Sequence, residues 1–285
     1  MLTLLSVAAC GAVALAAAPV ALVAQARGAF RRIVAINRGR PSGLLSVSGS
    51  YGEDHDGDAI TIGILGDSLA AGLGADDVSG TPSALIGTAV AARARRPVRI
   101  VNVARAGSGA SDLARQTDRL LAQGRIDIAV VIVGANDAAV ATSGTLRDRT
   151  LSRSAARLGQ TIVELKQNAT EVICCTCPDL GVAPALPVPL RWALRLSGRR
   201  LAQLQHAHTL RNGGIPVPLA ELACPEYAAN PGLLSDDRFH PSSAGYQLSS
   251  AAVIHEITRL LSGEGVARGR GLQPSIEGPS PAASD

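Results

Sequence analysis

Two kinds of hydrophobic pattern alternate between residues 59 and 264. Short continuous apolar runs are typical of parallel strands that helices cover on both faces, whereas apolar residues at every third or fourth position are typical of helices. The runs predict strands at Ala59–Leu65, Val98–Val103, Ile126–Val133, Glu171–Thr176 and Ile215–Leu219. Helical segments lie between and after these runs, near residues 82–95, 110–123, 146–167, 190–212 and 244–262.

This alternation predicts an α/β protein with three layers, α/β/α, built on a flavodoxin-like parallel sheet of five strands. Pro216 and Pro218 have no backbone N–H, so we expect the last strand at an edge of the sheet. In open parallel sheets, ligands bind beyond the carboxyl ends of the strands. Candidate functional residues are therefore expected in the loops that follow the strands.

The two ends of the 285-residue chain differ in composition from the predicted domain at 59–264. Residues 1–26 carry no charged side chain, which predicts an N-terminal transmembrane anchor or a signal segment cleaved near Ala26. Residues 27–58 are first basic and then rich in Gly, Ser and Asp, which predicts a linker. Residues 265–285 have no apolar period and are predicted to be a disordered tail.

The apolar N-terminal segment predicts attachment to the cell membrane or cell envelope, or secretion if it is cleaved. A cluster of arginines follows it, at Arg27, Arg31, Arg32, Arg38 and Arg40. The positive-inside rule would keep the domain on the cytoplasmic side, whereas export would place it in the envelope, so the side of the membrane stays open.

Charge and aromatic content limit the class of partner. The net charge of +4 arises largely from the arginine cluster, because the rest of the chain is nearly neutral. Aromatic residues make up only 2% of the chain, so few side chains could stack on the bases of single-stranded nucleic acid. We expect no nucleic-acid partner, and the sequence leaves the oligomeric state open.

The cysteines do not have the spacing of a metal site. Cys174, Cys175 and Cys177 share one strand-like run, Cys224 stands alone and Cys10 lies in the N-terminal apolar segment. No Cys/His spacing resembles a zinc site, and we expect these thiols to be small buried residues without a metal or cofactor. A disulfide between Cys177 and Cys224 stays open.

Four short polar blocks occur in the places where a parallel sheet should form a site. Three of them follow predicted strands, and the last precedes the final predicted helix. The blocks are Gly66-Asp67-Ser68-Leu69, Asn102 to Gly107, Gly134-Ala135-Asn136-Asp137, and Asp237-Arg238-Phe239-His240-Pro241.

In this order the four blocks resemble the SGNH hydrolase family, a branch of the GDSL esterases and lipases. The Ser, Gly, Asn and His of the family name match Ser68, Gly107, Asn136 and His240. The segments Thr176–Gly181, Pro189–Trp192 and Arg238–Ser242 are similar to the membrane-anchored SGNH proteins of actinobacteria. The resemblance implies the SGNH hydrolase fold and an esterase or lipase-type hydrolase that needs no metal.

The resemblance also implies a role for each residue. Ser68 would be the nucleophile, His240 the base that takes its proton, and Asp237 the acid that orients the imidazole. An oxyanion hole would combine the backbone N–H groups of Ser68 and Gly107 with the side-chain amide of Asn136. Asp67 and Asn102 would support these groups. Asp236 in place of Asp237, and Gly109 in place of Gly107, remain alternatives.

We expect hydrolysis of carboxylic esters through an acyl-Ser68 intermediate, with a small ester, an acyl lipid or a cell-envelope ester as substrate. An acyltransferase with the same triad, or a catalytically idle binding protein on the same fold, is the alternative. The proline-rich segment 178–189 is predicted to form one wall of the site.

Overall fold

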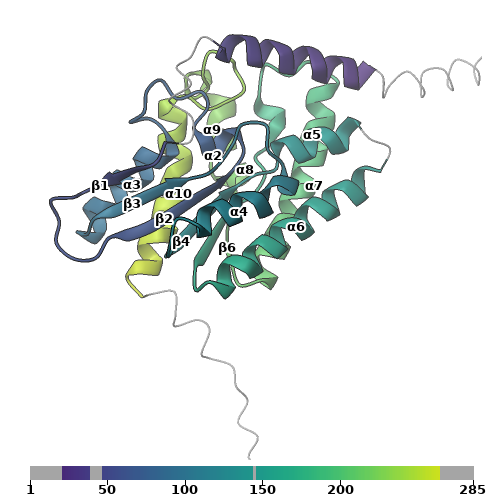
Figure 1. Ribbon diagram of the computed structural model, residues 1–285. Helices are drawn as coiled ribbons and strands as arrows, with labels where there is room; N and C mark the ends of the chain where they lie inside the picture. Colours follow the sequence, from purple (N-terminus) through teal and green to yellow (C-terminus); the bar gives the residue numbers. More distant parts are fainter. Residues whose placement is uncertain (1–20, 39–46, 144–145, 264–285) are drawn as a thin grey trace, which may run out of the picture.

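The computed structural model describes residues 21–38, 47–143 and 146–263. In this part of the chain a sheet of six strands has the order β1-β3-β2-β4-β5-β6 (Figure 1). The strands are β1 (Gly49–Tyr51), β2 (Ile60–Gly66), β3 (Val98–Asn102), β4 (Ile128–Ile132), β5 (Glu171–Cys175) and β6 (Ile215–Val217). The segments β2 to β6 coincide with the five predicted strands, and β6 lies at an edge as its prolines require.

The five predicted helices are confirmed to within a few residues. They are α3 (Pro82–Ala94), α4 (Leu113–Leu121) preceded by η2 (Ala110–Asp112), α6 (Arg147–Gln167), α7 (Leu190–Arg211) and α10 (Ser243–Leu261). Shorter elements were not predicted, because one or two turns carry too little periodicity. They are α2 (Ser68–Ala71), α5 (Ala135–Ser143), η3 (Leu180–Val182), α8 (Leu219–Leu222), α9 (Cys224–Ala229) and η4 (Pro231–Leu233).

Helices cover both faces of the sheet, and this explains the continuous apolar strands (Figure 1). Successive residues of a strand point to opposite faces. In β2, Ile62 and Ile64 join one core cluster with residues of α3 and α10. Leu65 joins the other cluster with residues of α4 and α6. The predicted three-layer α/β architecture is confirmed.

The sheet has one more strand than the five we predicted, and it is mixed rather than wholly parallel. Residues 49–51, which were predicted to belong to the linker, form β1 and pair antiparallel with β3. The Gly-Ser-Tyr sequence has no apolar run to reveal a strand. The strand is anchored to the core by Tyr51, whose ring packs against α3 at Gly87.

A helix over residues 21–37 crosses the predicted boundary between the N-terminal segment and the linker, at residues 26 and 27. It lies over the end of the sheet at which the parallel strands finish (Figure 1, purple). Leu22 and Ala26 pack against a core cluster of the domain. Among the helices of the described residues, none has the length and apolar character needed to span a bilayer. Residues 1–20 of the predicted anchor and the tail at 265–285 lie outside the described part.

The four described cysteines are buried free thiols, as the spacing predicted. The disulfide left open between Cys177 and Cys224 is not formed. Burial raises the pKa of the Cys174 thiol to about 12, so this thiol stays protonated at neutral pH. Cys10 lies outside the described residues.

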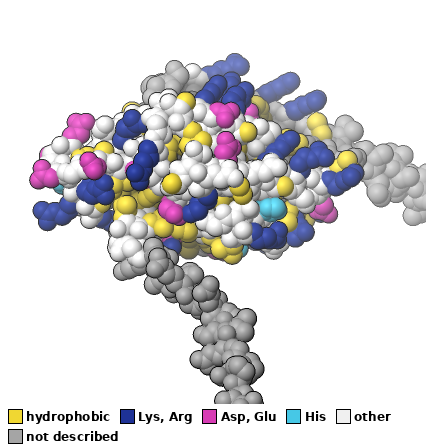
Figure 2. Space-filling model, turned by 60° about the horizontal axis from the view of Figure 1, so that its bottom comes forward, with side chains coloured by type: hydrophobic (Ala, Val, Ile, Leu, Met, Phe, Trp, Pro, Cys, Tyr) yellow, Lys and Arg dark blue, Asp and Glu magenta, His cyan; other side chains and the backbone are white. Residues whose placement is uncertain are grey.

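Charged side chains are dispersed over the surface. On the face that Figure 2 shows, Arg and Lys side chains stand among acidic and uncharged ones. Elsewhere in the described residues, charged side chains also form ion pairs, such as Arg115 with Asp112 at 2.6 Å and Lys166 with Glu171 at 2.8 Å. The positive net charge is therefore not gathered into one patch on this face.

Gly66, at the end of β2, has a conformation that no other residue can adopt without strain. Its φ is +139°, and a Cβ there would overlap the carbonyl oxygen of Ile132. We expect Gly66→Ala to lower the free energy of unfolding by about 3 kcal/mol or more, measured by urea denaturation. Gly124→Ala is the control, because Gly124 has φ +105° but open space around it. The control should cost only about 1–2 kcal/mol, and an equal cost for both would show that overlap is unimportant.

Candidate active site

The four polar blocks meet at the carboxyl edge of the sheet. Ser68 begins α2 shortly after β2, Gly107 lies in the loop after β3, and Asn136 lies in the first turn of α5 after β4. His240 lies in the loop before α10. All four residues line one cavity, so the structure brings together residues up to 172 positions apart.

Ser68 is held on a tight turn between strand and helix. Asp67 caps α2, because its carboxylate accepts the Leu69 N–H at 3.0 Å. Gly72 ends the helix in the left-handed conformation after a single turn. The Ser68 side chain consequently emerges at the edge of the sheet, where its Oγ lies 2.9 Å from Nε2 of His240.

The other ring nitrogen of His240 faces Asp237. Nδ1 lies 2.6 Å from Oδ2 of Asp237, which completes a chain of hydrogen bonds from Ser68 through His240 to a carboxylate. Asp237 is buried whereas Asp236 is exposed, so the geometry selects Asp237 from the two adjacent acids.

Asp237 stays ionised in spite of its burial. Oδ1 accepts hydrogen bonds from Ser235 Oγ at 2.9 Å and from the backbone N–H groups of Phe239 and His240 at 2.9 and 2.8 Å. Burial alone would raise the pKa of Asp237, but its hydrogen bond and charge interaction with His240 hold the pKa well below the ordinary value. A permanent carboxylate can therefore fix the tautomer of the imidazole.

Gly107 and Asn136, the two further residues predicted to form the oxyanion hole, line the cavity next to Ser68. Gly107 has φ +84°, and this left-handed backbone explains why a glycine is needed there. The Asn136 amide donates one hydrogen to the Ser108 carbonyl at 2.8 Å, which orients the side chain and leaves its second N–H for a ligand. Gly109 is not equivalent, since its N–H is already bonded to Asp112 Oδ2 at 3.0 Å.

Asn102, predicted to support the site, makes three side-chain hydrogen bonds. Its amide nitrogen donates to the Ala70 carbonyl and to Ser83 Oγ, both at 2.9 Å, and its oxygen accepts the Ala104 N–H at 2.9 Å. Asn102 thus ties α2 to α3 and to the loop after β3. Its side chain is fully occupied by these bonds and lies behind the site.

Two other residues that support the site, Gln116 and Asp137, were not predicted as such from the sequence. The Gln116 amide bonds to both the N–H and the carbonyl of Gly66, at 2.7 and 2.9 Å. Asp137 accepts the Ala110 N–H at 3.0 Å and the Ser154 hydroxyl at 2.7 Å, which braces the loop after Gly107. The only signal for Gln116 is a polar residue on the apolar face of α4.

The ionisation of Asp67 is expected to make the free energy of unfolding depend on pH. Burial raises its pKa to about 6, although its bond to Leu69 N–H and the charge of His240 act against the increase. The unfolded chain then loses this proton at lower pH than the folded protein, so the contribution to stability falls as the pH rises from about 4 through about 6. The expected decrease in the free energy of unfolding is on the order of 3 kcal/mol.

Asp67→Asn is the test of this expectation. The variant keeps an oxygen for the Leu69 N–H and has no proton to lose. Between pH 4 and pH 7 the free energy of unfolding, measured by urea denaturation, should fall by about 3 kcal/mol less in the variant than in the wild type. Asp118→Asn, at an exposed position, should retain the wild-type difference. An identical pH dependence in Asp67→Asn and wild type would contradict a raised pKa at Asp67.

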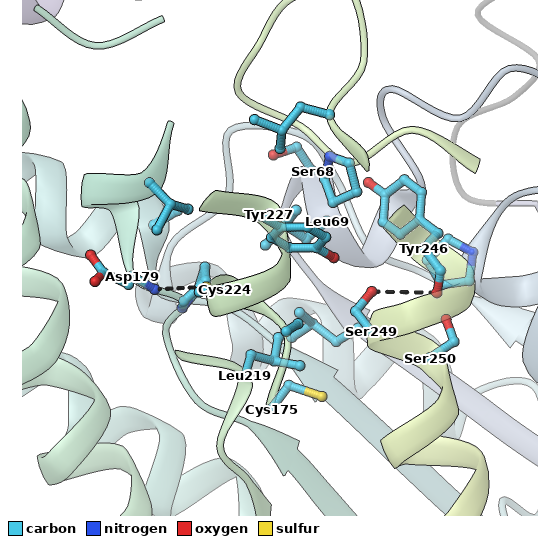
Figure 3. Close-up of a pocket in the computed structure, with 18 of the residues that line it drawn as sticks. Ser68, Leu69, Cys175, Asp179, Leu219, Cys224, Tyr227, Tyr246, Ser249 and Ser250 are labelled. Atoms are coloured by element: carbon cyan, nitrogen blue, oxygen red, sulfur yellow. Dashed lines mark hydrogen bonds between the residues drawn. The ribbon is translucent and has the colours of Figure 1, made fainter. Parts of the chain in front are cut away.

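Two apolar cavities adjoin Ser68. The larger encloses about 370 Å³ and also contains Gly107, Asn136 and His240 at its polar end. The smaller encloses about 60 Å³ and extends below Ser68 between Tyr227, Tyr246 and Cys175 (Figure 3). Residues 178–189 contribute Leu180 to both cavities and Leu186 to the larger, in agreement with the predicted wall.

No group of three or more His, Cys, Asp or Glu side chains within the described residues has a metal-binding arrangement. The site instead combines a buried carboxylate, an imidazole, a hydroxyl and free N–H donors. These groups together can abstract a proton, form a covalent bond to a carbonyl carbon and stabilise an oxyanion.

Comparisons with known proteins find both similar sequences and similar folds. Residues 64–248 match the GDSL-like Lipase/Acylhydrolase family. A GDSL-like esterase of Mycobacterium tuberculosis is 36% identical over 189 residues, which are 66% of this chain and 58% of that protein.

Two solved structures share the fold. A lipase/acylhydrolase from Enterococcus faecalis has a TM-score of 0.56 at 24% identity, over 70% of this chain and 95% of the other. An acetylxylan esterase from Geobacillus stearothermophilus has a TM-score of 0.53 at 21% identity, over 71% of this chain and 95% of the other.

Proposed function

The chain belongs to the GDSL-like lipase/acylhydrolase family of ester hydrolases, and we propose that it cleaves carboxylic esters through an acyl intermediate on Ser68. The hydrogen-bonded chain from Ser68 through His240 to Asp237 carries this proposal. A serine hydroxyl is a poor nucleophile until a base takes its proton, and Nε2 of His240 lies 2.9 Å from that hydroxyl.

In the first half-reaction the Ser68 proton moves to His240 Nε2 while Oγ bonds to the carbonyl carbon of the ester. The carbonyl electron pair moves to oxygen, where the N–H groups of Ser68 and Gly107 and the amide of Asn136 would receive the negative charge. The ester C–O bond then breaks, and His240 returns its proton to the leaving alcohol. Asp237 stabilises the imidazolium without itself taking a proton.

In the second half-reaction a water molecule gives its proton to His240 and its oxygen attacks the acyl carbon. Collapse of this second oxyanion breaks the bond to Oγ, releases the carboxylic acid and returns the proton to Ser68. An alcohol in place of water would make the same residues an acyltransferase. A catalytically idle binding protein would have no need of three convergent donors beside a buried carboxylate and imidazole.

The apolar lining of both cavities supports an ester with a hydrocarbon group, such as an acyl lipid or a cell-envelope ester. Side chains from the 180–194 segment and Phe239 line the larger cavity next to the reacting groups. A cavity of about 370 Å³ lies within the usual range of small-molecule sites, about 300–1,000 Å³.

A fluorophosphonate probe tests the enzymatic proposal directly, because an activated serine displaces its fluoride and becomes phosphonylated, whereas an ordinary serine does not react. Wild-type protein should gain one adduct by intact mass spectrometry, at Ser68 by peptide mapping, and Ser68→Ala should gain none. Hydrolysis of p-nitrophenyl esters by the same preparation separates an esterase from an idle binding protein. A wild type that neither labels nor hydrolyses any ester would refute the proposal.

Membrane attachment rests on the uncharged composition of residues 1–26. Gln25 accepts the Leu190 N–H and donates to the Val188 carbonyl, both at 3.2 Å, so cleavage near Ala26 would remove contacts above the cavity. Carbonate extraction of membranes, with sequencing of the mature N-terminus, distinguishes the cases. An intact N-terminus in the extracted pellet supports an anchor, whereas a released chain that starts near Arg27 supports a cleaved signal.

A further inference from the structure

The helix over residues 21–37 lies outside the segment 64–248 that matches the family, yet it covers the candidate active site. Ala29 and Ile33 on its inner face are 2% and 7% exposed. Ala29 belongs to one core cluster with Leu186, Leu190 and Leu194. This burial makes the helix an integral part of the domain rather than an appendage.

Side-chain hydrogen bonds hold the helix near both of its ends. Gln25 bonds to the backbone at Val188 and Leu190, as described above. Twelve positions later, Asn37 bonds to the acid of the triad, with 2.7 Å between its Nδ2 and Oδ2 of Asp237. The helix is thereby fixed directly above Ser68 and His240.

The orientation of the Asn37 amide follows from its neighbours. Its nitrogen donates to the Ile33 carbonyl at 2.8 Å and to Asp237 Oδ2 at 2.7 Å. Both partners are acceptors, so the amide oxygen cannot take this place. Asp237 Oδ2 therefore lies between two donors, Asn37 Nδ2 and the His240 Nδ1–H, and cannot rotate away from the imidazole.

The same helix forms one wall of the larger cavity. Ala26, Phe30 and Val34 line it from above, and Leu190, Leu194 and Phe239 line it from the domain side. The other cavity at Ser68, at about 60 Å³, has room for only a small group. Of these two cavities, the larger one beneath the helix is therefore the one with room for a long hydrocarbon chain of an ester at Ser68.

We propose that the helix over residues 21–37 is part of the active site, in two ways that rest on the proposed ester hydrolysis. Its apolar face binds the longer hydrocarbon chain of the ester and so determines chain-length specificity. Asn37, through its bond to Asp237, is a positioning residue for His240.

The wall is tested with Val34→Trp, which would fill the cavity. We expect kcat/KM for p-nitrophenyl octanoate to fall by about tenfold or more, and for p-nitrophenyl acetate by less than about threefold. Octyl acetate against ethyl acetate tests whether the chain belongs to the alcohol instead of the acyl group. Ile36→Trp is the control, since Ile36 is on the exposed face of the same helix.

Phe30→Ala is the second variant, in case the larger tryptophan perturbs folding. Loss of its ring from the wall should raise KM for the octanoate several-fold and leave the melting temperature within a few degrees of wild type. Two results would overturn the proposal that the helix binds the hydrocarbon chain. One is an equal effect of Val34→Trp on long and short chains in both ester series, and the other is no effect of either variant.

The positioning role is tested with Asn37→Ala and Asn37→Asp. Loss of the donor should lower kcat about tenfold for short and long esters alike with KM within about twofold of wild type, and Asn37→Asp, with an acceptor facing Asp237, should lower kcat further. If Asn37 has only a structural role, its variants should have a lower melting temperature and an unchanged kcat. That result would overturn the positioning role. Wild type that labels at Ser68 and hydrolyses esters keeps the proposed function intact whatever these variants do.

Discussion

Ser68→Ala is expected to lower kcat for ester hydrolysis by on the order of 10⁴-fold or more, because the variant cannot form the acyl intermediate. The residual rate would come from binding and from the oxyanion donors, which this substitution leaves in place. KM for the substrate should change little, since the Ser68 hydroxyl contributes to bond formation more than to binding. Initial rates with p-nitrophenyl butyrate give both constants.

The substitution should leave the fold intact. Alanine is a good helix residue, and Ser68 makes its side-chain bond to His240 alone. The melting temperature of Ser68→Ala should therefore stay within a few degrees of wild type. Ser262→Ala, at an exposed position after α10, should retain full activity. A folded Ser68→Ala variant with a rate near wild type would show that another group is the nucleophile.

Asn136→Ala is expected to lower kcat by about 10²–10³-fold, which corresponds to about 2.7–4 kcal/mol of lost transition-state stabilisation. The Asn136 side chain lines the cavity beside Ser68 and retains one N–H after its bond to the Ser108 carbonyl. The hydrogen bond from that N–H would be strongest in the transition state, when the carbonyl oxygen becomes an anion, so KM should change little.

Part of the effect could come from loosening of the loop at Ser108, and Asn136→Asp separates the two contributions. The aspartate keeps the size of the side chain but has an acceptor in place of the amide donor, so its kcat should be as low as that of Asn136→Ala or lower. Asn168→Ala, at an exposed position after α6, should have wild-type kinetics. A loss of less than about fivefold in both Asn136 variants would exclude Asn136 from the oxyanion hole.

Most of the central fold was predictable because its signals are local. A continuous apolar run with turn residues on both sides identifies a strand between helical layers, and β2, β4 and β5 have this pattern. β1 could not be found in this way, because its three residues gain burial only from Tyr51 packing on a helix that follows later in the chain. The helix over residues 21–37 was hidden by composition, since its first residues are as apolar as a membrane segment.

The residues of the candidate site likewise fall into those that the sequence predicts and those that only the structure reveals. The four polar blocks and their order were visible, because each is contiguous and follows an element with a strong pattern. The motif favoured Asp237 and left Asp236 as an alternative, and the two adjacent acids are separated only by burial and by the direction of the side chain. Gln116 and Asn37 have no motif around them, and their partners lie 50 and 200 positions away.

The sequence by itself determined the layers, the strand order at the β6 edge and the residues that could perform acyl transfer, because hydrophobic period and short motifs are properties of neighbouring residues. Only the tertiary structure decided which acid faces His240, which backbone groups are free to bind a ligand, and that an N-terminal helix covers the cavity. These depend on contacts between distant segments, whose geometry follows from packing of the whole core rather than from any local pattern.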